Sequence, residues 1–252
     1  MALLRVEKVT RRFGGLEALK EVSFSLHEEQ IKALIGPNGA GKTTMFNVIA
    51  GSDRPTSGCI LLWDEDITGR RAHQICRLGV GRTFQHSIVF NDMSVLDNVR
   101  VGRYTKTRTG IMPAVLRLPS HRREEKAVTE AAEHALRRAG LEAKAAEPAG
   151  NLPLGERHLL EIARALAAEP SVLLLDEPAA GLNDEETDRL AAIVRQIRDE
   201  GVTILLVEHD MGFVMDLSDE VVVLDYGRKI AEGPPLMIQN DEQVIKAYLG
   251  ED

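Results

Sequence analysis

The amino-acid sequence predicts an α/β fold, in which a sheet of buried strands is interrupted by a helical segment. Short, largely apolar runs at residues 31–35, 172–175 and 202–207 are typical of strands that are buried on both faces. Segments with apolar residues at helical spacing, such as 155–168, alternate with these runs. Between about residues 91 and 150, strand signals are almost absent and Ala, Glu, Arg and Lys dominate. We therefore expect an α/β core with an inserted helical subdomain.

The N-terminal part is expected to form strands. Residues 3–9 and 21–26 alternate in polarity, as half-buried strands do, and residues 11–16 are expected to be the turn between them. Strand 31–35 then leads through a glycine-rich loop into a helix that ends near Gly51. Another strand-like run follows at residues 59–63, and a short run at 80–84, apolar at its start, leads to Gln85.

Helices and strands alternate again toward the C-terminus. Residues 122–140 favour a helix that ends at Gly140 as its C-cap. Pro170 ends helix 155–168, so the apolar run 172–175 forms a separate strand. The later expected elements are helix 184–200, strands 202–207, 221–224 and 229–232, a turn at Tyr226 and Gly227, and a tail helix from about Asp241.

The most specific chemical signal lies directly after strand 31–35 and matches the phosphate-binding pattern G-x-x-x-x-G-K-[ST]. Its residues are Gly36, Pro37, Asn38, Gly39, Ala40, Gly41, Lys42, Thr43 and Thr44. Glycines let the backbone curl around an anion, so that N–H groups and the positive end of the next helix point at a phosphate. Lys42 supplies a charge for the β- and γ-phosphates and Thr43 a hydroxyl for Mg²⁺. The alternative is a glycine-rich turn with a chance lysine, and the strand before and helix after it argue for a nucleoside triphosphate.

A second group of polar residues follows two of the buried strands. Asp176 and Glu177 end strand 172–175 at the edge where open α/β sheets bind ligands. Asp176 is expected to hold Mg²⁺ through water, and Glu177 to polarise an attacking water as general base. His209 follows strand 202–207, which is expected beside the Asp176 strand, and its imidazole could donate to a γ-phosphate. Alone, the two acids could simply begin a surface loop and His209 could be an ordinary surface residue.

Composition narrows the class of protein. The 252 residues are 44% hydrophobic and 28% charged, which is ordinary for a globular protein, and the net charge of −8 argues against general nucleic-acid binding. No apolar run approaches the roughly 20 residues that span a bilayer, and no signal peptide precedes Leu3, so a cytosolic chain is expected. Cys59 and Cys76 have the spacing of neither a disulfide framework nor a zinc site.

In their order along the chain, the phosphate loop, Gln85, residues 152–168, Asp176 with Glu177, and His209 resemble the nucleotide-binding subunit of ATP-binding-cassette (ABC) transporters over essentially the whole length. The resemblance implies a P-loop NTPase core with a mixed sheet, an N-terminal antiparallel β subdomain and an inserted α-helical subdomain. It implies a single domain, with a core of residues 1–88 and 156–252 and an insertion at about 89–155.

The resemblance also implies ATP and Mg²⁺ as ligands and a role for further residues. Phe13 would stack on adenine, and Gln85 would reach Mg²⁺ and the attacking water and sense the membrane partner. With Thr43 and Asp176, Gln85 completes the expected metal ligands. The loop of residues 181–183 would contact an opposite subunit.

Weaker cues narrow the resemblance to importers of branched-chain and related hydrophobic amino acids. They are the runs 13–16, 81–85, 159–166, 178–183, 225–233 and 244–250. The partners implied are integral membrane permease subunits, a second ATPase subunit in a homo- or heterodimer and, indirectly, a periplasmic solute-binding protein. The place implied is the cytoplasmic face of the inner membrane, where the chain would be peripheral.

One segment departs from the family pattern. The signature, usually Leu-Ser-Gly-Gly-Gln, reads Leu152, Pro153, Leu154, Gly155 and Glu156. The serine hydroxyl that caps the other subunit's γ-phosphate is absent, and Glu156 places a carboxylate where an uncharged amide is usual. The helix that begins nearby still aims its dipole at the phosphate. A catalytically weak, binding-only cassette therefore stays open as an alternative, as does a soluble ABC ATPase of DNA repair or translation.

Residues 100–126 carry an excess of Lys and Arg together with apolar side chains. Because the rest of the chain is acidic, this segment is expected to dock on the membrane subunits or their lipid surface. If it does not, the dock is expected nearer residues 85–90.

Overall fold

The computed structural model describes residues 2–83, 89–107 and 119–249, and its strands form two sheets. The antiparallel sheet has the order β2-β1-β4-β5, from Leu16–His27, Ala2–Phe13, Ser57–Leu62 and Glu65–Asp66. The second sheet has the order β10-β9-β3-β8-β7-β6, from Arg228–Gly233, Glu220–Asp225, Ile31–Ile35, Thr203–Val207, Val172–Asp176 and Val80–Arg82. Its strands are parallel except for β10, so the sheet is mixed. The α/β class, the mixed sheet and the N-terminal antiparallel β subdomain are confirmed.

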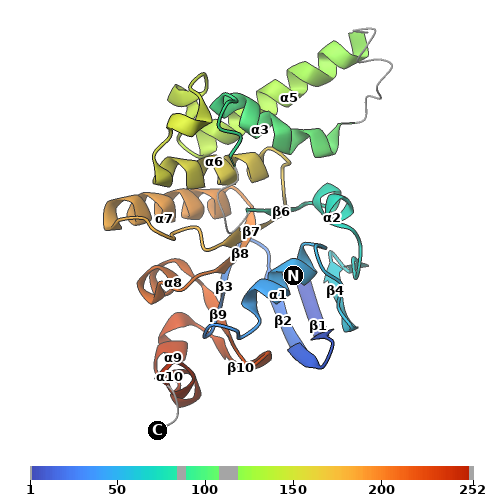
Figure 1. Ribbon diagram of the computed structural model, residues 1–252, viewed down its shortest axis with the longest axis vertical. Helices are drawn as coiled ribbons and strands as arrows, with labels where there is room; N and C mark the ends of the chain where they lie inside the picture. Colours follow the sequence, from blue (N-terminus) through green and yellow to red (C-terminus); the bar gives the residue numbers. More distant parts are fainter. Residues whose placement is uncertain (1, 84–88, 108–118, 250–252) are drawn as a thin grey trace.

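The helices divide between the insertion and the core. Their bounds are α1 Lys42–Ile49, α2 Ala72–Leu78, α3 Val95–Arg103, α5 Pro119–Arg138, α6 Leu154–Leu166, α7 Asp184–Asp199, α8 Met211–Leu217, α9 Pro235–Gln239 and α10 Glu242–Leu249, with short 3₁₀ turns at Tyr104–Lys106, Glu142–Lys144 and Ala149–Asn151. Helices α3, α5 and α6 pack together at one end of the molecule, and the C-terminal helices lie at the other end (Figure 1).

Two cores lie on opposite faces of the mixed sheet. Side chains of β3 alternate between them, because successive residues of a strand point to opposite faces. Leu34 joins the core that α1 forms with the antiparallel sheet, whereas Ala33 and Ile35 join the core under helices α3, α6 and α7. Helix α1 is thus held between the two sheets, with the phosphate loop at the mouth of this layer.

The sequence located most elements within a few residues, and the main differences lie in one turn and three helices. The turn expected at 11–16 is wrong: β1 and β2 extend to a two-residue turn at Gly14 and Gly15. Irregular pairing between these strands breaks the polarity alternation on which the prediction relied. Helices α2, α8 and α9 were not predicted, and α2 buries only Ile75 and so has no apolar stripe. Pro235 at the start of α9 was the available signal.

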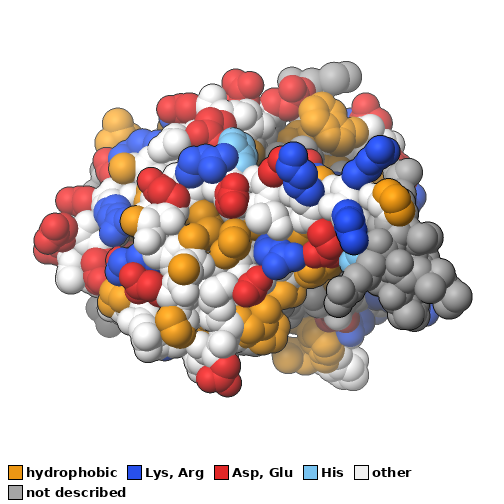
Figure 2. All heavy atoms as spheres, turned by 90° about the horizontal axis from the view of Figure 1, so that it is seen from above, with side chains coloured by type: hydrophobic (Ala, Val, Ile, Leu, Met, Phe, Trp, Pro, Cys, Tyr) orange, Lys and Arg blue, Asp and Glu red, His pale blue; other side chains and the backbone are white. Residues whose placement is uncertain are grey.

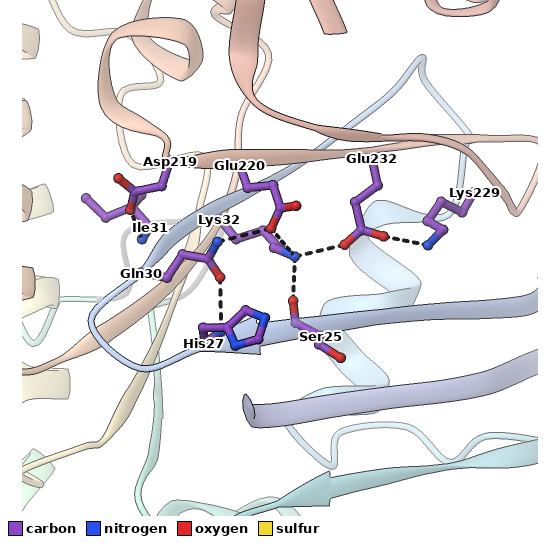
Figure 3. A network of polar contacts seen from close by, with 9 residues as sticks. All are labelled: Ser25, His27, Gln30, Ile31, Lys32, Asp219, Glu220, Lys229 and Glu232. Atoms are coloured by element: carbon purple, nitrogen blue, oxygen red, sulfur yellow. Dashed lines mark hydrogen bonds and ion pairs between the residues drawn. The ribbon is translucent and has the colours of Figure 1, made fainter. Parts of the chain in front are cut away.

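A buried lysine links the two sheets (Figure 3). Lys32 is the polar residue of β3, and its side chain is 1% exposed. Its Nζ lies 2.8 Å from a carboxylate oxygen of Glu220 and 2.8 Å from one of Glu232, and it also donates to the Ser25 carbonyl of β2. Burial alone would raise the pKa of Glu232, but hydrogen bonds from Lys229 and Lys32 lower it. The charge on Lys32 is therefore compensated, as a buried ammonium requires.

Candidate nucleotide-binding site

The phosphate loop connects β3 to α1, and glycine is required at two of its positions. Gly36 has φ 147°, and a Cβ atom there would lie 2.0 Å from the Leu224 carbonyl oxygen. Gly41 has φ 106°, and a Cβ atom there would lie 2.6 Å from the Ala18 carbonyl oxygen. Side chains are thus excluded both by the left-handed backbone and by space. The loop passes close to β2 and β9, which fix its path.

Lys42 is buried within this loop. Its Nζ donates to the Gly36 carbonyl at 2.6 Å and to the Pro37 carbonyl at 2.9 Å. Burial lowers the pKa of Lys42, and the negative charge of Glu177 partly opposes that effect. The ammonium is thus held where the loop curls, with a carboxylate nearby, and a phosphate could take over its hydrogen bonds.

A cavity of about 450 Å³ brings most of the predicted residues together. Its lining includes Phe13, Asn38, Gly39, Ala40, Gly41, Lys42, Thr43, Thr44, Glu177 and His209. Tyr226, on the turn between β9 and β10, also lines it and is 79% exposed. Sequence analysis identified this residue only as part of a turn, because nothing in the local sequence shows that the turn faces the phosphate loop.

Glu177 and His209 form a contact across the carboxyl ends of β7 and β8. The Nε2 atom of His209 lies 2.9 Å from Oε1 of Glu177. Strand β8 lies between β3 and β7, which confirms that the His209 strand neighbours the Asp176 strand. Glu177 has φ 50°, an uncommon conformation for a residue other than glycine, and its N–H donates to the Val207 carbonyl. The carboxylate can therefore act as a base while the imidazole orients it.

Asp176 is fully buried at the end of β7. Its Oδ2 accepts a hydrogen bond from Arg82 at 2.9 Å, and Arg82 also donates to Asn47 at 2.7 Å. The other oxygen, Oδ1, is buried and has no hydrogen-bond partner among the described residues. A buried carboxylate oxygen without a donor suits Mg²⁺ or its water shell. Thr43 is exposed to the cavity, so the described residues fit the ion; Gln85, the third predicted ligand, lies outside them.

Phe13 lies at the end of β1 and is 47% exposed. The guanidinium of Arg11 lies over its ring, 4.3 Å from the ring centroid. Asp53 holds that guanidinium with a hydrogen bond of 2.8 Å and an ion pair of 2.7 Å. One face of the ring is thus backed by a fixed cation, and its other parts stay available to a planar base.

The C-terminal helix reaches the outer side of the phosphate loop. A second cavity, of about 490 Å³, lies between residues 37–40 and α10. Burial raises the pKa of Tyr248 to about 12, although a backbone hydrogen bond with Gly36 lowers this pKa in part. The tail helix therefore touches the loop, which the sequence did not indicate.

The departing signature begins α6 and does not line the cavity of its own chain. Pro153 occupies the N-cap position without a side-chain cap, and Leu154 is 45% exposed. Lys144 binds both carboxylate oxygens of Glu156, at 2.8 Å and 2.5 Å. The negative charge of Glu156, at a position where the family usually has an uncharged amide, is thus neutralised by Lys144 of the same chain. No side chain of the described residues caps the first N–H groups of α6.

Several basic side chains of the segment 100–126, which was expected to dock on the membrane subunits, form ion pairs within the chain. Arg100 pairs with Asp97 and Glu125, Arg103 with Glu169, and Lys126 with Glu130. On the described part of the face seen from the helical end, acidic and basic side chains are interspersed rather than gathered by sign (Figure 2). Residues 108–118, which include most of the apolar part of the predicted dock, lie outside the described residues.

An apolar groove of about 450 Å³ lies between α2, β6 and α3. Its lining includes Ala72, Cys76, Phe90, Val101 and Ala165. Phe90 is 44% exposed, so a large apolar side chain borders the groove at the surface. Phe90 belongs to the segment 85–90 in which sequence analysis placed its alternative dock, and residues 85–88 of that segment lie outside the described residues.

Known proteins are similar to this chain in sequence and in fold. Residues 19–180 match the ABC transporter family model, and residues 228–252 match a model of the branched-chain amino acid ATP-binding cassette transporter. The chain is 45% identical over 250 residues to the high-affinity branched-chain amino acid transport ATP-binding protein LivG of Escherichia coli K12, covering 99% of this chain and 98% of the relative. It is 44% identical over the same spans to BraF of Pseudomonas aeruginosa.

Solved structures agree. A nucleotide-free ATP-binding cassette from an ABC transporter superposes with a TM-score of 0.88 at 30% identity, covering 100% of both chains. The ADP conformation of an ATP-binding cassette superposes with a TM-score of 0.87 at 31% identity, also over 100% of both chains. Within the described ranges, no helix is long and apolar enough to cross a bilayer. With its phosphate loop, Glu177 and His209 at one cavity, the chain belongs to the ABC transporter family and is an ATPase cassette.

Proposed function

We propose that this chain binds and hydrolyses Mg-ATP to energise a membrane importer of branched-chain or related hydrophobic amino acids. The observation that carries the proposal is the cavity where the phosphate loop, Glu177 and His209 meet, in a chain whose relatives of the same length are named for branched-chain amino acid transport. The C-terminal match to the branched-chain model supports the choice of solute class.

The residues of the cavity divide the chemistry between them. The N–H groups of residues 39–44 and the Lys42 ammonium hold the phosphates, and Phe13 stacks on the base. Glu177 accepts a proton from the attacking water, and His209, in contact with that carboxylate, keeps it oriented. Asp176 and Thr43 would hold Mg²⁺, which neutralises charge on the phosphates when bound.

A second subunit completes the site. The signature does not line the cavity of its own chain, and the N–H groups at the start of α6, which no described side chain caps, would face the γ-phosphate bound to the partner. Because Lys144 neutralises Glu156, the departure from the usual signature does not by itself favour the binding-only alternative. A head-to-tail pair of cassettes follows, in which ATP closes the pair and hydrolysis reopens it.

The apolar groove is the proposed dock for a cytoplasmic segment of the permease. A charged residue there would oppose burial of that segment, so Phe90→Asp should lower co-purification with the permease at least tenfold. Trp63→Asp is the matched control, since Trp63 is a half-exposed aromatic (51%) on the turn between β4 and β5 and does not line the groove. Equal co-purification of both variants would place the dock elsewhere.

Transport itself tests the proposal. The chain would be expressed with its permease and a periplasmic solute-binding protein, at the cytoplasmic face of the membrane. ATP-dependent uptake of labelled leucine is expected, and Lys42→Ala should abolish it because the phosphates lose their cation. Uptake of another solute class would overturn the choice of amino acid. ATP binding without turnover in the complete complex would support the binding-only cassette instead.

A further inference from the structure

Glu208 is a buried carboxylate between the loop after β7, which carries Glu177, and the loop after β8, which carries His209. It follows β8 directly, precedes His209, and is 3% exposed. A buried carboxylate needs donors for its oxygens, because its desolvation is otherwise costly. The proposed chemistry assigns no role to Glu208, although it is buried directly beside His209.

The two oxygens of Glu208 accept hydrogen bonds from different loops. Oε1 accepts from the backbone N–H of Ala179 at 2.7 Å, and Oε2 accepts from the backbone N–H of His209 at 2.9 Å. Ala179 belongs to the loop after β7, two residues beyond Glu177. One side chain therefore spans the loops that carry the two members of the Glu177–His209 contact.

The same loop is held from its other side by the signature helix. Nδ1 of His158, on α6, donates to the Pro178 carbonyl at 2.6 Å. Residues 178 and 179 thus lie between a donor from α6 and an acceptor at the end of β8. The polar contacts run continuously from the signature helix through this loop to Glu208 and His209.

We propose that Glu208 is a positioning residue that sets the Glu177–His209 contact and couples it to the loop of residues 178–183. This inference rests on the proposed function, because it assigns Glu208 a role in that same hydrolysis. Charge-assisted hydrogen bonds to backbone N–H groups are short and strong, which suits a tie between two loops. When the loop is displaced by a partner subunit, Glu208 transmits the displacement to the catalytic pair.

Glu208→Gln tests this assignment. A carboxamide has one acceptor oxygen, so it can serve one N–H group and must turn its own donors toward the other. Because small misplacements of catalytic groups cost up to about 100-fold in rate, kcat should fall roughly 10- to 100-fold. The dissociation constant of ATP should change less than about threefold, since Glu208 does not line the cavity. Glu208→Met, which keeps volume but offers no acceptor, should lower kcat further.

Two measurements separate positioning from loss of stability. Hydrogen exchange at the Ala179 and His209 amides should accelerate in Glu208→Gln, while amides of α1 keep their protection. Glu232→Gln is the matched control: it alters another hydrogen-bonded carboxylate, one that does not line the cavity, and should lower Tm without lowering kcat.

The failures are distinguishable. If wild-type complex hydrolyses ATP and Glu208→Gln does so at the same rate, the inference is overturned and the proposed function stands. A kcat loss that Glu232→Gln reproduces at equal Tm would also overturn it. If the wild-type complex does not hydrolyse ATP, the proposed function itself fails.

Discussion

Replacing Lys32 should destabilise the whole cassette, because this ammonium is the buried link between the two sheets. Removing one member of a buried ion pair typically costs about 3–5 kcal/mol, since the partner charge is left uncompensated. Lys32 is 1% exposed, but its partners Glu220 and Glu232 are 29% and 23% exposed, so water relieves part of the cost. For Lys32→Met, whose side chain fills similar space, we expect a loss of about 3 kcal/mol in the free energy of unfolding.

Lys229 provides the control within the same network. Its ammonium contacts the other oxygen of Glu232 but is 32% exposed. A partly solvated pair is worth little, so Lys229→Met should cost less than about 1 kcal/mol. Both variants would be unfolded in urea at fixed pH, and the midpoints and slopes compared with wild type. Equal, small losses for the two lysines would refute the reasoning that burial makes Lys32 the structural cation.

Acid titration gives a second readout of the same network. The pKa of Glu232 is lowered in the folded chain from its ordinary value of 4.5. Its contribution to stability is therefore present above pH 4.5 and is lost as the pH falls through the lowered folded value. Lys32→Met removes one cause of this lowering, so its stability should fall less steeply in that range. An unchanged acid slope would indicate that Lys32 does not stabilise the ionised carboxylate.

Three further predictions concern the nucleotide site. Phe13→Ala should weaken ATP and GTP alike by about 1–3 kcal/mol, because stacking reads a π-face and not a base edge; direct titration with both nucleotides checks this. Asp176→Asn should abolish the Mg²⁺ dependence of ATP affinity, since a neutral amide holds the ion poorly, and affinities with and without Mg²⁺ would show it. Lys144→Met should weaken ATP-driven dimerisation by releasing the charge of Glu156, and Glu156→Gln should restore it; ultracentrifugation compares the single and double variants.

Site residues could be predicted from the sequence alone where they belong to one continuous segment of the chain. The glycines and Lys42 of the phosphate loop, and Asp176 with Glu177 at a strand end, are recognisable because their spacing reflects one loop and one strand. The Glu177–His209 contact could be expected only because parallel strands share an edge. In each of these cases the relevant neighbours are close in the chain or follow from the sheet.

Other features depend on neighbours that are distant in sequence. Lys144 and Glu156 come from a 3₁₀ turn and the next helix, and no periodic signal predicts their ion pair. Lys32 is a single charged residue in an apolar strand, and its burial is explained only by its partners on β9 and β10, Glu220 and Glu232. Tyr226 and Glu208 carry no motif of their own, because their positions at the site depend on where neighbouring loops converge.

The assignment of Glu177 as the general base is the central claim, and one variant tests it most directly. Glu177→Gln keeps the side-chain shape and a hydrogen-bond acceptor but cannot accept a proton from water. We predict that this variant binds Mg-ATP with near wild-type affinity, accumulates as an ATP-bound dimer in size-exclusion chromatography, and hydrolyses ATP at least 100-fold more slowly, in line with the usual contribution of a general base. Hydrolysis at the wild-type rate, with no dimer accumulating, would contradict the account.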